Sequence, residues 1–404
     1  MSNKPVQIDP ELVRQFSLQK QLLNNSPLPK GKAGVLSVIE KLGYVQIDTI
    51  NVIERSHHIV LFTRCLDYKQ KYLHVLQAQD KKIFEYWAHA ASFIPMKDYR
   101  FYIGAIEKKP KEDSWLGEWI KENHSLIKKV RKRMEREGPL TAGDFADVTD
   151  RKRGTWWDWK PAKMALEVLF WQGILMIKER RNFQRVYDLT ERVLPKNLDT
   201  TKPTIEEEKE FFIRRALGAL GIATIKDINS YIGVGGKLNE WVDKMLKAKE
   251  ITEIEIKGIK KPYYVLSKDI PELLMEKKTS DTRVHFLSPF DNSIILRDRI
   301  STLFEFNYSL ECYVPKNKRK YGYFCLPILW HNRLVGRIDP KADRQNKILI
   351  INNVHIEDKK VISKGFIRAF AQSLQNFSRF HSCEKIEFNK KISTKITKTI
   401  LKHY

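Results

Sequence analysis

Apolar and polar positions follow helical and strand periodicities that divide most of the first 280 residues into a recurring unit. From 125 to 190 the pattern predicts three helices and then two strands around a basic tip at residues 178–182. The first helix (125–137) is stopped by Gly138-Pro139, and Thr141 can cap a short second helix through Phe145. The third helix is expected to begin at Pro161 and to end at Gly173, because proline favours the first position of a helix and glycine often ends one. Helix, helix, helix, hairpin is the order of a winged-helix unit.

The same order recurs from 205 to 267, where Thr224 opens the second helix and Lys257-Gly258 form the tip of the hairpin. The first 110 or so residues fit the plan more loosely, with a helical face ended by Gly43 and a possible wing in KKIFEYWAHAASFI. The pattern therefore predicts three tandem winged-helix units. Their expected ranges are 1–120, 121–200 and 201–280.

After residue 280 short apolar runs separated by turn residues predict a β-rich domain, barrel-like, over 281–404. A helix from Val361 to Phe377 carries one apolar face and is expected to pack across this sheet. The chain ends in a basic tail. The fold class expected from the whole pattern is α+β.

Charge then narrows the function. The 404 residues include 73 Lys and Arg and 49 Asp and Glu, which gives a net charge of +24. This charge favours a polyanionic partner, such as nucleic acid. The alternative is a basic surface without a dedicated partner. Four isolated cysteines show no spacing for zinc or a disulfide framework, so reduced thiols and no metal or cofactor are expected. No apolar run approaches a membrane span. We expect a monomer of the cytosol or, within it, of the nucleoid.

Residues 42–64 hold the densest candidate chemistry. Alternation over 45–48 turns Gln46 and Asp48 to one side, and a carboxylate beside an amide can hold and polarise a water molecule. The bland interpretation is that Asp48 only caps a helix starting near Thr49. A second Gln-Ile-Asp, at 7–9, precedes Pro10 and is typical of a helix cap at Asp9. On these residues alone, capping is the commoner role.

Five motifs in order, GYVQIDTINVIERSHH, FEYWAHAASFIP, LSPFD, YVPKNKRKYGYFCLPIL and GRIDPKADR, resemble the bacterial YcaQ-type winged-helix DNA glycosylases, also called AlkX, the sister group of AlkZ. The resemblance covers nearly the whole chain. It implies three winged-helix units and a β-barrel-like domain in a C-shaped clamp around duplex DNA. The catalytic signature of the family, glutamine, an apolar residue and aspartate, falls on Gln46, Ile47 and Asp48.

The resemblance further implies a monofunctional DNA glycosylase that hydrolyses the N-glycosidic bond of N7-alkylated purines and unhooks interstrand crosslinks. Its partner would be double-stranded DNA bearing alkylated purines or crosslinks, and Asp48 becomes catalytic rather than a mere cap. The alternative is a non-enzymatic winged-helix DNA-binding protein, a regulator or architectural factor, in which Gln46 and Asp48 are structural.

The remaining candidates support or surround this pair. His57 and His58 are either phosphate contacts, buried hydrogen-bonding groups or contributors to catalysis, and His89 either walls the site or satisfies a core hydrogen bond. Arg55 and Arg64 are expected to bind phosphate or to pair with acids. GRIDPKADR is expected to be an ion-paired turn that also touches the DNA backbone. The tryptophans of the segment Trp156–Trp159 are expected to pack in the core and loops, with stacking on DNA bases as the less common alternative. The predicted DNA contacts are Arg55, Arg64, Lys178, Arg180, Arg181, Lys257, Arg337, Lys341 and Arg344.

Overall fold

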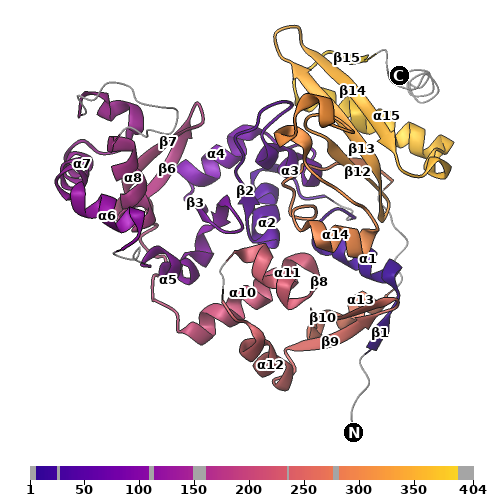
Figure 1. Cartoon of the computed structure of the whole chain (residues 1–404), viewed down its shortest axis with the longest axis horizontal. Helices are drawn as coiled ribbons and strands as arrows, with labels where there is room; N and C mark the ends of the chain where they lie inside the picture. Colours follow the sequence, from indigo (N-terminus) through magenta and orange to yellow (C-terminus); the bar gives the residue numbers. More distant parts are fainter. Residues whose placement is uncertain are drawn as a thin grey trace. The chain divides into compact units, whose positions relative to one another are not determined.

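The computed structural model describes residues 6–24, 28–108, 113–148, 161–233, 236–275 and 282–389. The chain divides into two compact units, and each is assembled from separate segments (Figure 1). Unit 1 holds residues 1–68, 87–92 and 209–404, and unit 2 holds residues 69–86 and 93–208. The predicted Trp156–Trp159 cluster lies outside the described residues. Within the described ranges, no helix has the length and apolar character needed to cross a membrane.

Unit 2 contains the predicted helices and hairpin of residues 125–190. The first and third helices are confirmed, as α7 (His124–Glu137) and α8 (Pro161–Trp171). The predicted short α-helix after Thr141 is instead a 3-10 segment, η2 (Ala142–Val148), with the Thr141 hydroxyl donating to Asp144. The other elements are α4 (Gln70–Ala78), η1 (Met96–Tyr102), α5 (Ile103–Ile106), α6 (Trp115–Glu122) and α9 (Thr190–Val193), with strands in the order β5 (Leu140–Thr141), β7 (Gln184–Leu189), β6 (Leu175–Arg181).

The hairpin of unit 2 turns later than predicted. Its two tip residues are Asn182 and Phe183, both with positive φ (47° and 68°), the conformation of a tight two-residue hairpin turn. Lys178, Arg180 and Arg181 therefore lie on strand β6 and not at the tip. The placement of this basic tip from sequence was wrong by a few residues, because an Asn-Phe turn is a weaker signal than Asn-Gly.

Unit 1 contains the second copy of the helix–hairpin order. α10 (Ile205–Leu220) leads into this unit, and Thr224 caps α11 (Ile225–Ile232) through a reciprocal capping box with Asp227. The predicted turn at Lys257-Gly258 is confirmed, with Gly258 at φ +82°. The N-terminal strand β1 (Val6–Ile8) joins this sheet parallel to β9, which the sequence did not indicate. The sheet order is β1, β9 (Ile251–Ile256), β10 (Ile259–Leu266), β8 (Ile222–Ala223), and α12 (Asn239–Lys247), η3 (Ser267–Asp269) and α13 (Ile270–Leu274) complete the segment.

The C-terminal part of unit 1 is built on a five-stranded sheet, in accord with the α+β prediction. Helix α15 (Lys364–Phe380) packs on the sheet (Figure 1). The rings of Phe370 and Phe377 are in edge-on contact with that of Phe286, at 5.3 and 5.4 Å between ring centres. Helix α14 (Arg297–Phe304) was not predicted. The strands follow the order β11 (Val284–Phe286), β12 (Leu326–Trp330), β13 (Arg333–Asp343), β14 (Ile348–Ile356), β15 (Lys385–Phe388), with short turns η4 (Glu311–Tyr313), η5 (Lys316–Lys318) and η6 (Lys359–Val361).

The segment GRIDPKADR is not the turn that the sequence suggested. Most of it lies inside β13, where it pairs antiparallel with β14, so that Arg337 is opposite His355. The proline at position 340 coincides with a shift in strand register, which is the kind of position where a sheet tolerates proline. The apparent turn chemistry of the motif is therefore accommodated by a bulge within a long strand.

The N-terminal elements of unit 1 lead directly to the predicted site. Helix α1 (Pro10–Lys20) begins at Asp9, whose side chain accepts from the backbone of Glu11, as predicted. Helix α2 (Gly31–Leu42) is ended by Gly43 at φ +82°, and a side chain there would also meet Arg215 at 2.7 Å. Strand β2 (Val45–Gln46) and helix α3 (Ser56–Arg64) follow. Of the hairpin strands β3 (Ile83–Trp87) and β4 (Ala91–Pro95), only the residues within 87–92 belong to unit 1.

Candidate active site

Gln46 and Asp48 lie at the end of β2, in a stretch of irregular backbone that precedes α3. The prediction that Asp48 caps a helix at Thr49 is wrong, because the next helix begins only at Ser56. The backbone N–H of Ile47 donates to the carbonyl of Ala91 at 2.8 Å and anchors the segment between the two polar residues. Both side chains are nearly buried, with exposed fractions of 9% for Gln46 and 8% for Asp48.

The environment of Asp48 makes it a stronger base than a surface aspartate. Burial is the main influence and raises the pKa of its carboxyl above the ordinary value. The backbone N–H groups of Ile50 and Thr49, the Ser56 hydroxyl and the positive charge of Arg55 oppose this shift without cancelling it. A carboxylate with a raised pKa, kept ionised by specific donors, is suited to accepting a proton from water.

Gln46 carries an unsatisfied acceptor. Its Oε1 atom is buried and has no hydrogen-bond partner among the described residues. Buried polar atoms are nearly always paired, so an exception calls for an explanation such as a bound water or a substrate group. The amide of Gln46 thus has the capacity to hold a water molecule beside the carboxylate.

A loop from a distant part of the chain, Leu287–Asn292, holds the candidate site together. Its Ser288 hydroxyl donates to the Ser56 hydroxyl at 2.6 Å, and the Ser56 hydroxyl lies 3.4 Å from Oδ2 of Asp48. Asn292 donates to the backbone carbonyl of Tyr44 at 3.0 Å, just before β2. The sequence analysis did not identify Ser56, Ser288 or Asn292, although the LSPFD motif that contains Ser288 was visible.

Arg64 is part of this framework and is not a DNA contact. Its guanidinium and the Asp291 carboxylate have no exposed side-chain surface and form a bidentate ion pair at 2.7 and 2.9 Å. Arg64 also donates to the carbonyl of Gln21 at 2.7 Å. Of the two roles expected for Arg64, pairing with an acid is confirmed and phosphate binding is wrong, since a fully buried guanidinium cannot reach DNA.

The histidines occupy separate environments. His58 Nδ1 lies 2.7 Å from the Tyr68 hydroxyl, and burial lowers the pKa of His58 to about 3, with a further contribution from Arg55. His58 is therefore neutral and is one of the buried hydrogen-bonding groups anticipated for this pair. His57 is also buried, with its ring 4.2 Å from that of His58. His89 is exposed, and its Nδ1 lies 2.6 Å from the carbonyl of Ser230.

Two more of the predicted DNA contacts are held within the protein. Arg337 is buried, pairs with Glu357 at 2.6 Å and lies 3.9 Å from the centre of the Tyr321 ring, so the prediction that it contacts DNA is wrong. Arg180 is largely buried and makes two hydrogen bonds to Glu85, at 2.8 and 2.7 Å. Because the guanidinium of Arg180 is held by Glu85, it is poorly placed to bind phosphate.

The remaining predicted contacts keep surface access. Arg181 is well exposed beside Glu179, and Lys178 is partly exposed beside Asp188. Arg55 is partly buried close to Asp48, as its effect on the carboxyl pKa indicates. Arg344 is exposed and donates to Asn51 Oδ1 at 2.7 Å and to the Ile53 carbonyl at 2.8 Å, which fixes the backbone just after Asp48. Lys257 and Lys341 are exposed.

An exposed aromatic residue also lies near Asp48. Tyr313 is 80% exposed, and its pKa is raised by partial burial of the hydroxyl, by Cys312 and by the negative charge of Asp48. The chain that follows is basic over residues 316–320 and is closed by Glu311, whose carboxylate accepts from three backbone N–H groups of residues 320–322. Tyr313 begins the motif YVPKNKRKYGYFCLPIL, but nothing in the sequence indicated a role for it.

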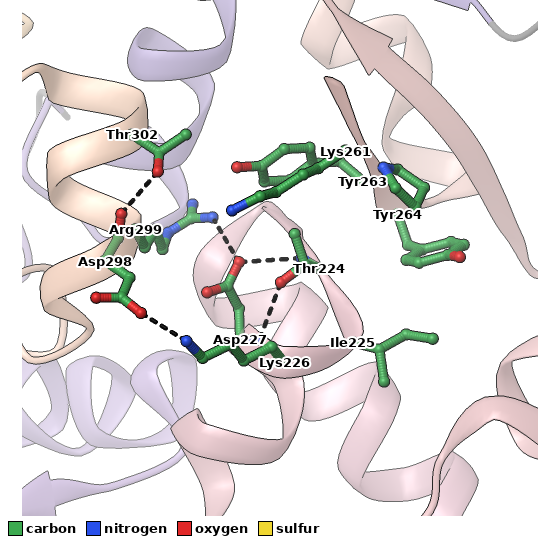
Figure 2. Close-up of a pocket in the computed structure, with 11 residues that line it drawn as sticks. Thr224, Ile225, Lys226, Asp227, Lys261, Tyr263, Tyr264, Asp298, Arg299 and Thr302 are labelled. Carbon is green, nitrogen blue, oxygen red and sulfur yellow. Dashed lines mark hydrogen bonds and ion pairs between the residues drawn. The ribbon is translucent and has the colours of Figure 1, made fainter. Parts of the chain in front are cut away.

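A separate cavity of about 340 Å³ in unit 1 does not belong to this site. It is lined by α11, α14 and β10, and neither Gln46 nor Asp48 faces it. Lys226 lies 2.6 Å from Asp298 and Arg299 lies 3.9 Å from Asp227. Figure 2 shows each of these basic side chains directed at its acidic partner. These four charged side chains of the lining already pair with one another. The described residues also contain no cluster of three or more His, Cys, Asp or Glu side chains suited to a metal ion.

Two comparisons bear on this geometry. A family model described as DNA glycosylase AlkZ-like matches residues 39–380, a range that contains both the Gln46–Asp48 segment and the 287–292 loop. The structure is also similar to that of the Streptomyces sahachiroi DNA glycosylase AlkZ, with a TM-score of 0.64, 17% sequence identity, and coverage of 96% of this chain and 100% of that one. At this identity the structural likeness concerns the fold.

Proposed function

Because the chain belongs to the AlkZ-like DNA glycosylase family, we propose that it is a monofunctional glycosylase that removes N7-alkylated purines from duplex DNA. The observation that carries this proposal is that the buried Asp48, with its raised pKa, lies two residues after Gln46, whose buried Oε1 atom is unsatisfied. These groups fit the activation of a water molecule. DNA as the substrate follows from the family and accords with the net charge of +24.

The leaving group explains why so few residues suffice. An N7-alkylated purine already carries a positive charge, so it departs with the electron pair of the glycosidic bond and needs no general acid. The sugar left behind resembles an oxocarbenium ion, which the carboxylate of Asp48 stabilises by its charge. Gln46 Oε1 accepts one hydrogen of a water molecule, and Asp48 accepts the proton released as the water oxygen bonds to C1′. The products are the free alkylpurine and an abasic site.

No lysine nucleophile takes part in this scheme, so the enzyme would leave the DNA backbone intact. We further propose that the helix–hairpin segments are three winged-helix units that, with the β-rich domain, grip the duplex from its backbone as a clamp. A base crosslinked to the opposite strand cannot swing out of the helix, whereas ordinary glycosylases flip their target. A monomer that reaches the sugar within the duplex would accept crosslinks as well as monoadducts.

The test is a base-release assay. Purified protein is incubated with a duplex that contains one N7-methylguanine or one nitrogen-mustard crosslink, and the DNA is then treated with alkali. We expect strand scission at the lesion only after alkali, together with free alkylpurine. A protein that only binds DNA would give a footprint without an abasic site, and covalent trapping with borohydride would contradict the monofunctional mechanism.

A further inference from the structure

Two buried serines connect Asp48 to the 287–292 loop through consecutive hydrogen bonds. The backbone N–H of Phe290 donates to Ser288 Oγ at 3.2 Å, Ser288 Oγ donates to Ser56 Oγ at 2.6 Å, and Ser56 Oγ donates to Asp48 Oδ2 at 3.4 Å. Both serines have no exposed surface. Because Ser56 opens helix α3 and Ser288 lies more than 230 residues later, this chain of bonds joins two distant segments at the carboxylate.

The number of protons fixes the direction of the chain. A hydroxyl donates one hydrogen, and an ionised carboxylate only accepts. Ser56 must give its hydrogen to Asp48, so it can only accept from Ser288, and Ser288 in turn accepts from Phe290. In the reverse direction, with Asp48 protonated and donating to Ser56, the Ser288 hydrogen would lose its acceptor in a site without solvent access. A protonated Asp48 could still accept from Ser56 through its other oxygen, but a hydroxyl hydrogen bond to an ionised carboxylate is the stronger one, so the arrangement favours the ionised form of Asp48.

We propose that Ser56 and Ser288 are positioning residues of the glycosylase reaction, which keep Asp48 ionised and hold its Oδ2 atom in place while the carboxylate accepts the proton of the attacking water. This inference rests on the function proposed above. The two hydroxyls offset part of the cost of burying the carboxylate. With these two hydrogen-bond donors, Asp48 is a base that is buried and still charged at the pH of the reaction.

A purely structural role for the serines makes a different prediction. If they only join α3 to the loop, their removal lowers stability and lowers activity equally at every pH. If they stabilise the charged form of Asp48, their removal raises the pKa of the catalytic base, and the acid limb of the pH–rate profile moves to higher pH. The position of that limb separates the two roles.

The experiment measures the single-turnover release of N7-methylguanine between pH 4 and 9 for the full-length protein and its variants. For Ser56→Ala we expect the acid limb to move up by about one pH unit, so that the rate on that limb falls roughly ten-fold. Ser288→Ala should give a smaller shift in the same direction, because Ser56 still donates to Asp48. The alkaline plateau should change much less than the acid limb.

The chain offers a matched control and a safeguard against misfolding. Ser293 donates to the buried Asp291 carboxylate at 2.6 Å and is not part of the chain to Asp48, so Ser293→Ala should leave the acid limb in place. The double variant Ser56→Ala/Ser288→Ala leaves no orphan hydroxyl. It should recover stability lost in Ser56→Ala and keep the shifted limb.

Several outcomes would overturn the inference. An acid limb that stays in place in Ser56→Ala and in the double variant would show that the serines are only structural, and an equal shift in Ser293→Ala would assign the effect to the loop as a whole. These results differ from a failure of the proposed function itself. In that case the wild-type protein releases no base at any pH, and the inference falls with it.

Discussion

The buried ion pair between Arg64 and Asp291 leads to a quantitative prediction for Asp291→Asn. The carboxylate accepts two hydrogen bonds from Arg64, at 2.7 and 2.9 Å, and two from Ser293, from its backbone N–H at 2.9 Å and its hydroxyl at 2.6 Å. An asparagine keeps the size of the side chain but turns an N–H group toward one of these donors and leaves the buried guanidinium without a counter-charge. Removing one partner of a buried pair costs about 3–5 kcal/mol. For a unit of this size we expect a fall in Tm of roughly 5–10 °C.

The pH dependence of this effect has a definite sign. Burial alone would raise the pKa of Asp291, but Arg64 and Ser293 outweigh it and hold the pKa below its ordinary value. The stabilisation is therefore complete above the pKa that Asp291 has in the unfolded chain and is lost as the pH falls through the lower, folded value. The Tm difference between wild type and Asp291→Asn should be largest near neutral pH and should shrink in acid.

Thermal melts from pH 3 to 8, paired with salt titrations of DNA binding, test this account. The double variant Arg64→Met/Asp291→Leu removes both charges and should recover part of the lost Tm, because apolar replacement of a buried pair is often tolerated. The recovery is limited by the Gln21 carbonyl, which loses its donor. A Tm change below about 1 °C in Asp291→Asn would refute the reasoning. If DNA binding by Arg64→Met depended less on salt while its Tm was unchanged, Arg64 would be a DNA contact after all.

Three further predictions follow from the site and its surroundings. Arg181→Glu should flatten the log–log salt dependence of duplex binding by about one unit, whereas Arg180→Glu should mainly lower Tm because Glu85 loses its partner; equal effects in the two variants would contradict this assignment. Because its folded pKa is raised, ionised Asp48 costs stability at neutral pH, so Asp48→Asn should raise Tm at pH 7 and have little effect at pH 3, and a lower Tm at pH 7 would argue against the raised pKa. Uracil and 8-oxoguanine, which lack a positive charge, should be released far more slowly than N7-methylguanine in the same duplex, and efficient release of uracil would refute the mechanism.

Many local elements of this protein could be predicted from its sequence, because the apolar periodicity and the residues that start or end helices and turns indicate the same boundaries. Pro161 and Gly173 bound a helix, Thr224 caps another and Gly258 turns a hairpin, each at the predicted position. Helix α14 was missed because its sequence, RDRISTLF, has only 8 residues and too few turns to show a clear helical period. Long-range pairing was missed for a different reason: no local pattern indicates that β1 will lie beside β9, some 250 residues later.

In the candidate site, too, local features could be predicted from the sequence and long-range contacts could not. The Gln46–Asp48 pair could be singled out from its alternation and its motif, but the groups that hold it could not. Ser56 and Ser288 are ordinary serines in the sequence, and only folding brings them together at 2.6 Å. Arg64 and Arg337 were expected at the DNA surface because a positive charge was visible and its burial was not. The Gln46–Asp48 pair could therefore be proposed from the sequence, whereas two of the arginines proposed as DNA contacts are buried inside the protein.

The most direct test of the central claim compares two aspartates that share the same tripeptide. Asp48→Asn and Asp9→Asn are assayed for single-turnover release of N7-methylguanine from duplex DNA, with DNA affinity measured in parallel. We expect Asp48→Asn to lose at least about 100-fold in rate while it retains affinity, because a positioned base acts on the chemical step. Asp9, a helix cap on the surface, should be replaceable with a change of at most a few-fold. A wild-type rate in Asp48→Asn would contradict the assignment of Asp48 as the catalytic base.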